Sequence, residues 1–470
     1  MTRNRGAKTM NVVVQKFGGT SVSSRGDLMK CAHRVVKAQQ EGYKPVVVVS
    51  AAGRRGEPYA TDTLVDLAKS IEPNVDVEPR ELDLLMTCGE IMSIVRMAQA
   101  IKVISGLPTV ALAGGQAGIY TDYNFGNARI LRIDPSYIQY VLEMGMIPVV
   151  AGFQGVTEHG VFGFHGAITT LGRGGSDTTA GALAAATGAQ GCEIYTDVDG
   201  VMTADPRVVG KKARVLDGVT YEEIKEMAHL GAKVVHPRCA EICEERGIPL
   251  RIRRFDSDVR GTIVKESVKN LDGNGHITAI TNSPSVTHIR LNISDSRDLS
   301  EVEREIYRSL GEGGVSIHFV SRTVNSFEFV VMREHMTAAI DVLDHLFIPI
   351  GRGMGNKGQR LYLLGVDRTG PAFRSRRREL GKLHPNVPIM NVAIEIGASR
   401  GIVSLVAANA REMPGIIARF LEALAGVGVD VGQTADAQHS ASCLVAEENM
   451  PKAVTALHDA FALQEGNGLD

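Results

Sequence analysis

The sequence predicts an α/β protein, a three-layer α/β/α sandwich around a mostly parallel sheet, followed by two ferredoxin-like α+β units. Short β-rich runs alternate with helical runs up to about residue 265, and this alternation is typical of a parallel sheet covered by helices on both faces. Glycine-rich loops follow several of these strands. After residues 271–275 the order changes to β-α-β-β-α, and this order occurs twice.

The strands of the first domain, expected at residues 10–268, lie where β-branched and other aliphatic residues cluster. They are predicted at residues 12–14, 46–50, 109–112, 147–151, 192–195 and 250–252. Apolar residues at helical spacing predict a helix after the first strand, and they are Leu28, Cys31, Ala32, Val35 and Val36. The small residues 180–186 predict a second helix.

The later region carries an internal repeat, with units expected at residues 280–348 and 397–470. The expected strands are residues 286–293, 315–320, 327–332, 401–407, 427–431 and 442–446, and the expected helices are 299–311, 337–347, 415–425 and 451–461. An insertion or linker at 349–396 carries the basic residues Arg374, Arg376, Arg377 and Arg378. Because aromatic residues do not alternate with these arginines, a solvated surface insertion is favoured over a nucleic-acid site.

The first glycine loop has the residues of a phosphate site. Lys16 ends the first strand and is followed by Gly18 and Gly19, so the backbone can approach a ligand while the lysine neutralises a phosphate. The helix start behind the loop offers further N–H groups to an anion. The order differs from the Walker pattern, in which lysine follows the glycines, and from the dinucleotide fingerprint, which has a third glycine. A polyphosphate nucleotide is therefore the expected ligand.

Two further loops carry charged and turn-forming residues. In residues 169–180, Arg173 suits a carboxylate because its guanidinium donates two parallel hydrogen bonds. Ser176 suits a helix start, and Asp177 suits the orientation of a lysine or a bound metal ion. Residues 195–207 contain Asp-Gly and Asp-Pro turns, whose exposed backbone groups suit a nucleotide base and ribose.

The composition indicates a globular enzyme without an electrostatic case for nucleic acid or membrane. The chain has 470 residues, 44% hydrophobic and 22% charged, with a formal net charge of −2. No run approaches the roughly 20 apolar residues of a membrane span. Cys239 and Cys243 share one face of a predicted helix, but a second pair and neighbouring histidines are lacking. We therefore predict reduced core cysteines in a cytoplasmic protein, and no metal site.

Together the loops resemble those of aspartate kinases within the amino-acid kinase family. The matching segments read KFGGTS at 16–21, TCGE at 87–90, GRGGSDTTA at 172–180, TDVDGVMTADPR at 196–207 and GAKVVHPR at 231–238. The later repeat resembles tandem ACT domains. The resemblance implies ATP and Mg²⁺, and phosphorylation of the side-chain carboxylate of L-aspartate to 4-phospho-L-aspartate, the first step toward lysine, threonine and methionine. It also implies a homodimer or higher homo-oligomer through the ACT units.

The resemblance assigns roles to individual residues. Catalysis would fall to Lys16, Asp177 and Lys233, with Asp177 holding Lys16 in place and ordering Mg²⁺. The substrate would be bound by Ser50, Glu90, Arg173 and Ser176, with Arg173 on its α-carboxylate and Glu90 on its α-ammonium. The nucleotide would be bound by Lys16, Gly18, Gly19, Thr196, Asp197, Met202, Ala204, Asp205 and Arg207.

An amino-acid effector, lysine or threonine or both, is expected in the second ACT-like unit. Residues Met413, Gly415 and Ile416 form a glycine turn at a helix start, whose N–H groups suit an effector carboxylate, and Gln433 follows at the next strand. The corresponding loop of the first unit, residues 294–298, lacks glycine and carries carboxylates that repel such a ligand.

Three alternatives stay open at this point. One is a catalytically idle amino-acid sensor, although Lys16, Arg173 and Asp177 are all present. Another is a different amino-acid kinase such as glutamate kinase, which the loops and the C-terminal repeat disfavour. The third concerns the repeat alone, whose two units would be ferredoxin-like packing modules without a ligand.

Overall fold

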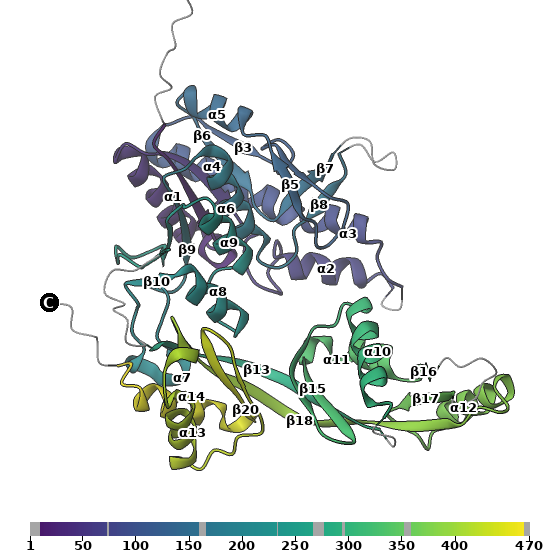
Figure 1. Cartoon of the computed structure of the whole chain (residues 1–470). Coiled ribbons are helices and arrows are strands. Elements are labelled where there is room, and N and C mark those ends of the chain that lie inside the picture. Colours follow the sequence, from purple (N-terminus) through teal and green to yellow (C-terminus); the bar gives the residue numbers. More distant parts are fainter. Residues whose placement is uncertain are drawn as a thin grey trace, which may run out of the picture.

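The N-terminal α/β domain lies above two smaller units formed by the later part of the chain (Figure 1). This computed structural model describes residues 10–72, 75–158, 166–232, 234–266, 277–293, 297–351 and 359–464. In the first domain, eight strands form one sheet in the order β10-β12-β11-β9-β1-β2-β6-β3. Every neighbouring pair is parallel except β11 with β12. The α/β fold with a mostly parallel sheet is therefore confirmed.

Six strands of this sheet lie at the predicted places, and two more, β10 and β12, lie at one edge. Their bounds are β1 Val12–Phe17, β2 Lys44–Val49, β3 Thr109–Leu112, β6 Ile147–Ala151, β9 Gly191–Thr196, β10 Gly218–Thr220, β11 Leu250–Arg254 and β12 Thr262–Lys265. A four-stranded sheet of order β5-β4-β7-β8 lies beside it, formed by β4 Ile119–Thr121, β5 Ile130–Ile133, β7 Gln154–Thr157 and β8 Ile168–Thr170.

Two hydrophobic cores lie on the two faces of the main sheet, each between the sheet and one layer of helices. One core joins Phe17 of β1 to Val35, Met97 and Ile101 on the helices of one face, and the five predicted helix positions are buried there. The other core joins Val14 to the opposite helices. The helices of this domain are α1 Arg25–Gln40, α2 Thr61–Lys69, α3 Pro79–Met86, α4 Cys88–Ser105, α5 Ser136–Glu143, α6 Gly175–Thr187, α7 Pro206–Val209, α8 Tyr221–His229 and α9 Pro237–Glu245.

One helical stretch, Pro79–Ser105, is long and apolar enough to pass a simple test for a membrane span. Half of its apolar window is buried inside the protein. The buried part includes Met97 and Ile101, which are fully enclosed in the core beside α1. The core helix of a folded domain meets the same length and hydropathy test.

The two C-terminal units share two long strands. β13, Ile277–Asn292, pairs antiparallel with β18, Ile389–Ala407, and the pairing has irregularities between Ser283 and Val286. The part of β13 before this irregularity pairs with the part of β18 that belongs to the second unit. The part of β13 after it pairs with the part of β18 that belongs to the first unit. The units are therefore built side by side on one continuous sheet, as the long ribbons in the lower half of Figure 1 show.

The first unit follows the predicted order, although its second helix ends early. Its other elements are α10 Leu299–Glu312, β14 Ile317–Arg322, β15 Ser326–Met332, α11 Met336–Leu343 and β16 Phe347–Ile350. Residues 337–347 were expected to be one helix, but Asp344 already has an extended backbone and Phe347 begins a strand. Ile348 and Ile350 alternate into the core of the unit, which favours a strand here.

Residues 360–365 and 389–396 of the segment 349–396 lie in the sheet, which corrects the expectation of a surface insertion. β17, Arg360–Gly365, pairs parallel with β18 through the crossover helix α12, Pro371–Leu383, and antiparallel with β16. Phe373 and Leu380 pack on Leu363, so α12 covers the opposite face from α10 and α11. The predicted arginine cluster lies on the exposed side of α12.

The second unit contains α13 Ile416–Gly426, β19 Thr434–Asp436, β20 Ser440–Ala446 and α14 Met450–Ala460. The strand expected at 427–431 does not form. Gly428 has a φ of +67°, which interrupts an extended chain, and ladder hydrogen bonding begins only where the Gly432 N–H donates to the Leu444 carbonyl at 2.8 Å. Val429 is still buried in the core, which explains the apolar pattern.

If α12 is a packed part of the sheet, Phe373→Ala will destabilise it. The ring is 2% exposed, and such a deletion costs about 3–5 kcal/mol in a closely packed core. We expect faster amide hydrogen exchange in β17 and α12, with exchange in β1 and β9 unchanged. Arg374→Ala, on the exposed side of the same helix, is the matched control and leaves exchange as it is. Equal exchange in Phe373→Ala and the parent would mean that α12 is only loosely attached.

Candidate active site

The predicted glycine loops meet at the carboxyl end of the parallel strands, where they enclose a cavity of about 390 Å³. The end of β1, the residues just after β2, the start of α4 and the first turn of α6 all contribute lining residues. Six of the predicted catalytic and substrate residues line it, namely Lys16, Ser50, Glu90, Arg173, Ser176 and Asp177. Residues from four separate segments of the chain thus share one site.

An ion pair between Lys16 and Asp177 organises the centre of the cavity. The Lys16 Nζ lies 2.7 Å from Asp177 Oδ1, and the two side chains are only 13% and 12% exposed. The second carboxylate oxygen, Oδ2, accepts a hydrogen bond from the backbone N–H of His236 at 3.1 Å. Both oxygens of Asp177 are therefore engaged, so the lysine ammonium is held in one position at the end of β1.

Glycine is required in both loops because other backbone and side-chain atoms come very close. A Cβ on Gly19 would lie 2.3 Å from the carbonyl oxygen of Ala51, and one on Gly174, whose φ is +68°, would lie 2.2 Å from the His236 ring. The chain after Gly19 forms a short 3₁₀ turn, and α1 begins only at Arg25. Its N-terminus is capped by Ser24, whose hydroxyl accepts a hydrogen bond from the Asp27 N–H, so one N–H group of this helix start is not open to a ligand.

Glu90 presents a free carboxylate oxygen to the cavity. The residue is 2% exposed, and this burial raises the pKa of its carboxyl group to about 8, although a hydrogen bond from the Ala51 N–H to Oε1 at 3.0 Å acts to lower the pKa. Oε2 is buried without a hydrogen-bond partner among the described residues. A cationic ligand group at this oxygen would satisfy it and favour the ionised form.

Arg173 lies at the mouth of the cavity. Its side chain is 86% exposed, and its Nη2 lies 3.3 Å from Oε2 of Glu334. Glu334 belongs to the short 3₁₀ segment before α11, so this contact joins the glycine loop to the first C-terminal unit. Because both side chains are well exposed, the contact is weak and easily exchanged for a ligand carboxylate.

Lys16 lines the cavity, whereas the nucleotide residues predicted between 196 and 207 lie at the end of β9 and in the loop behind it, outside the lining. Asp205 caps α7 and holds Arg207 at 2.7 Å, and Asp197 lies 3.4 Å from Arg54. Thr196 donates to Asp197, and the backbone of Met202 forms a bridge with Val215. Ala204 is 3% exposed and packs in the core of the second C-terminal unit, so only its backbone is available.

The remaining predicted residues lie elsewhere. Lys233 and residues 294–296 lie outside the described residues. Met413, Gly415 and Ile416 line a separate cavity of about 170 Å³ beside α13. Gln433 does not line this cavity, because its amide Nε2 donates to Glu328 of β15 at 3.3 Å and so joins the two C-terminal units.

Phe153 is a cavity residue that sequence reasoning missed. Its φ of +69° lies in the left-handed region, which is strained for an aromatic residue, and its ring meets the position that a Cβ on Gly175 would occupy. Its backbone N–H donates to Thr179 of α6 at 3.1 Å. Thr61 and Asp62, at the start of α2, also line the cavity and were missed. No local sequence pattern reports a strained loop of this kind.

Asp83 is a second missed residue, and it acts on the cavity through the loops. The side chain is fully buried and accepts hydrogen bonds from the backbone N–H groups of Gly126 and Thr170 and from the Thr170 hydroxyl. Burial raises the pKa of its carboxyl group, and these hydrogen bonds oppose that rise. Asp83 thus ties α3 to the loops that precede the second glycine cluster.

Comparisons with known proteins agree over the whole chain. A family model described as the amino acid kinase family matches residues 11–254, and a model of the ACT domain matches residues 403–461. The chain is 38% identical over 462 residues to the aspartokinase of Mycobacterium tuberculosis, covering 97% of both chains.

Solved structures show the same fold. The structure of E. coli aspartokinase III with aspartate and ADP has a TM-score of 0.67 at 22% identity, covering 96% of this chain and 99% of the other. The structure of the same enzyme with lysine and aspartate has a TM-score of 0.64 with the same coverage and identity.

The buried carboxyl group of Glu90 predicts a dependence of stability on pH. With a folded pKa near 8 and an unfolded pKa near 4.5, the native state binds more protons between these values, so Glu90 reduces stability as the pH rises through this window. The slope is at most about 1.4 kcal/mol per pH unit. We expect Glu90→Gln to remove this dependence of stability on pH. Urea unfolding of both proteins between pH 5 and 8 measures it.

The control for this measurement is Glu41→Gln, which changes an exposed glutamate at the end of α1 and leaves the slope as it is. If Glu90→Gln and the parent lose stability equally between pH 5 and 8, the carboxyl group ionises freely in the folded protein. The assignment of a raised pKa would then be wrong.

Proposed function

This chain belongs to the aspartokinases of the amino acid kinase family, and we propose that its cavity transfers the γ-phosphoryl group of ATP to the side-chain carboxylate of L-aspartate, giving 4-phospho-L-aspartate. The observation that carries the assignment is the Lys16–Asp177 pair, set beside the free oxygen of Glu90 in one cavity. These groups offer one cation for phosphates and one anion for an amino group. Arg173 at the mouth adds a cation for a carboxylate.

Catalysis of this reaction requires mainly that the reactants are held in position and that their negative charge is neutralised. Phosphoryl transfer passes through a loose, in-line transition state, and protein groups contribute by holding the reactants and stabilising spread charge. The aspartate side chain is ionised at neutral pH, so the nucleophile needs no general base. The site has to hold two mutually repelling anions in line.

Each residue has a role that follows from its place. Lys16, fixed by Asp177, neutralises the transferring phosphoryl group. By resemblance, Gly18 and Gly19 would bring backbone donors to it. Glu90 accepts the α-ammonium group, and Arg173 binds the α-carboxylate in place of Glu334. Further roles come from the resemblance. Lys233 would be a second cation on the phosphates, and Ser50 and Ser176 would donate to the substrate.

The nucleotide would lie along the end of β9, framed by Thr196, Asp197, Met202 and the backbone of Ala204, with the Asp205–Arg207 pair at its edge. Mg²⁺ would neutralise charge on the β- and γ-phosphate oxygens. Asp177 already pairs with the Lys16 ammonium and accepts a hydrogen bond from the His236 backbone N–H, so it fits a water-mediated contact with the ion better than a direct one. Most of the ligands of Mg²⁺ would then be phosphate oxygens and water.

A substrate comparison tests the proposal against other amino-acid kinases and against an idle sensor. We expect ADP release with L-aspartate and much slower release with glutamate, UMP or carbamate. Release with glutamate alone would favour glutamate kinase, and none with any acceptor would favour the sensor. The protein is proposed to act in the cytoplasm, and as a homo-oligomer formed through its ACT units.

Regulation is proposed to act through the second ACT-like unit. The cavity beside α13 is lined by Gly415 and Ile416 at the start of this helix, and a helix start suits the carboxylate of an effector. Arg411 and Asp436 also line it and offer charges of both signs to an amino acid. Lysine is the first effector to test, with threonine and the pair after it. Gln433 would act by joining the two units through Glu328.

Lys16→Met tests the phosphate role. The variant keeps most of the side-chain length and removes the charge, so we expect turnover to fall by orders of magnitude in a folded protein. Steady-state ADP release and circular dichroism measure the two properties. Lys37→Met, on the exposed face of α1, is the control and keeps its turnover. Near-normal turnover in folded Lys16→Met would remove Lys16 from the mechanism.

Arg173→Lys tests the substrate role. The change keeps the charge but loses the two parallel hydrogen bonds, so we expect the KM for aspartate to rise by about 30-fold, which corresponds to about 2 kcal/mol. The KM for ATP is expected to stay the same. An unchanged KM for aspartate would mean that Arg173 serves the nucleotide or the fold.

Glu334→Gln is the matched test of the competing contact. It removes the charge that pairs with Arg173 and leaves the cavity intact. Because exposed ion pairs contribute about 0.2–1 kcal/mol, the KM for aspartate should fall by at most about fivefold, and the difference should shrink in high salt. In the Arg173→Lys background the effect should be smaller still, because the two residues act on each other.

Gly415→Asp tests the effector site. The backbone there has a φ of +77°, which strains any other residue, and the new carboxylate repels the effector carboxylate. We expect inhibition by lysine or threonine to weaken within the 5- to 150-fold range of typical allosteric coupling. Gly428→Asp is the matched control, because its φ is +67° with open space around it, away from the cavity. Strong inhibition in Gly415→Asp would place the effector elsewhere.

A further inference from the structure

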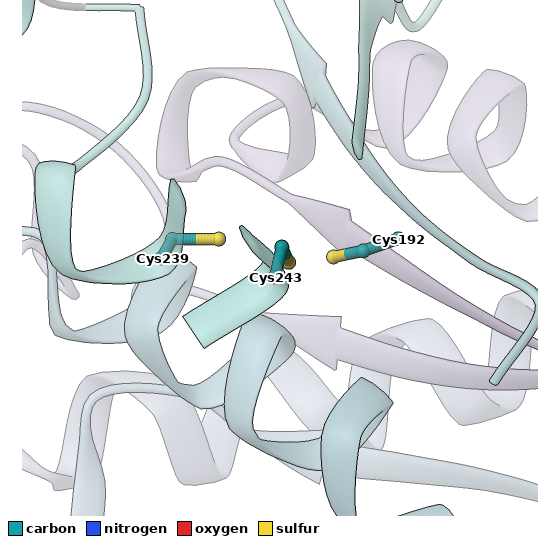
Figure 2. Close-up of side chains that lie close together, drawn as sticks. All are labelled: Cys192, Cys239 and Cys243. Atoms are coloured by element: carbon teal, nitrogen blue, oxygen red, sulfur yellow. The ribbon is translucent and has the colours of Figure 1, made fainter. Parts of the chain in front are cut away.

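Three cysteine thiols converge in the core behind the active site. Cys192 lies on β9, and Cys239 and Cys243 lie one turn apart on α9, with their sulfur atoms directed toward one another (Figure 2). The three Sγ atoms lie within 4.8 Å of one another, and all three residues are fully buried. The sequence shows only the pair on the helix, because the third thiol comes from a strand 47 positions before it.

This spacing is close to that of a metal–thiolate site. With a Zn–S bond of about 2.3 Å, the sulfur atoms of a tetrahedral site lie about 3.8 Å apart, so the thiols need to approach by no more than about 1 Å. Soft thiolate ligands select thiophilic ions and reject Mg²⁺, which serves the phosphates in the active site. The cluster is therefore separate in chemistry from the nucleotide site.

Charge decides which ion fits. Three thiolates around a monovalent ion would carry a net charge of −2 in the core, whereas three around a divalent ion carry −1. Because burial of net charge is costly, a divalent thiophilic ion is preferred to a monovalent one.

We propose that Cys192, Cys239 and Cys243 form a three-thiolate site for a divalent thiophilic ion, with Zn²⁺ as the ordinary occupant. Binding forms three metal–sulfur bonds and releases three thiol protons to solvent, with no change of oxidation state. Since all three thiols are buried, the ion enters as the domain folds. The proposal does not depend on the identity of the phosphoryl acceptor.

The location gives the ion a structural role next to catalysis. Cys239 also meets the position of a Cβ on Gly181 of α6, the helix that carries Asp177. His236, just before α9, donates its backbone N–H to Asp177. An ion that joins β9 to α9 would therefore fix the backbone that holds the Lys16–Asp177 pair. Removing the ion should lower thermal stability first and activity second.

The experiment measures metal in the full-length protein. The parent is refolded under reducing conditions with one equivalent of Zn²⁺ or Cd²⁺, passed over a desalting column and analysed for metal by mass spectrometry. We expect about one ion per chain, a thiolate-to-Cd²⁺ absorption band in the ultraviolet, and a Tm that rises with the ion. Cys192→Ala, Cys239→Ala and Cys243→Ala should each lose the ion and the band.

Cys31→Ala and Cys443→Ala are the matched controls, because each removes one equally buried thiol that lies outside the cluster. Both should keep the ion. Retention of the ion by all three cluster variants would overturn the proposal, as would refolded parent that takes up no ion and shows no band. The measurement on the parent keeps the test decisive even where a cluster variant fails to fold.

Discussion

The ion pair between Lys16 and Asp177 is the interaction on which the active site depends. Its partners come from β1 and the first turn of α6, and the backbone of His236 before α9 completes it. With both side chains nearly enclosed, either charge alone would be left without compensation in a poorly solvated place. This constraint requires glycine at positions 19 and 174. At both positions, backbone or ring atoms of a neighbouring loop occupy the place where a Cβ would lie.

Local patterns predict this part of the protein well. A lysine that ends a hydrophobic strand, a pair of glycines and a helix of small residues are all short-range features, and a parallel sheet places such loops at one edge. The mostly parallel sheet, the two helical layers and the shared lining of Lys16, Arg173 and Asp177 follow from them. The raised pKa of Glu90 does not, because it depends on how deeply α4 is buried.

Features that depend on distant pairing were missed. β13 and β18 each serve both C-terminal units, and a repeat seen in sequence suggests two separate modules instead. Residues 360–365 form a strand between β16 and β18, yet their apolar run stands just before a basic helix and was assigned to an insertion. The thiol cluster was missed for the same reason, since Cys192 joins its partners only through the packing of β9 against α9.

The small free energy of the ion pair between Arg173 and Glu334, at the mouth of the cavity, limits its part in regulation. An exposed pair such as Arg173 with Glu334 contributes up to about 1 kcal/mol, whereas a shift from 1:99 to 99:1 between two states needs about 5.5 kcal/mol. Effector binding therefore has to change other contacts between the domains as well. Thr203 with His458, and Glu226 with Ser440, join the kinase domain to the second unit and are buried or nearly so. Ser440 lines the proposed effector cavity and Thr203 belongs to the loop behind β9, so a movement of the second unit would reach the proposed nucleotide side before the substrate side.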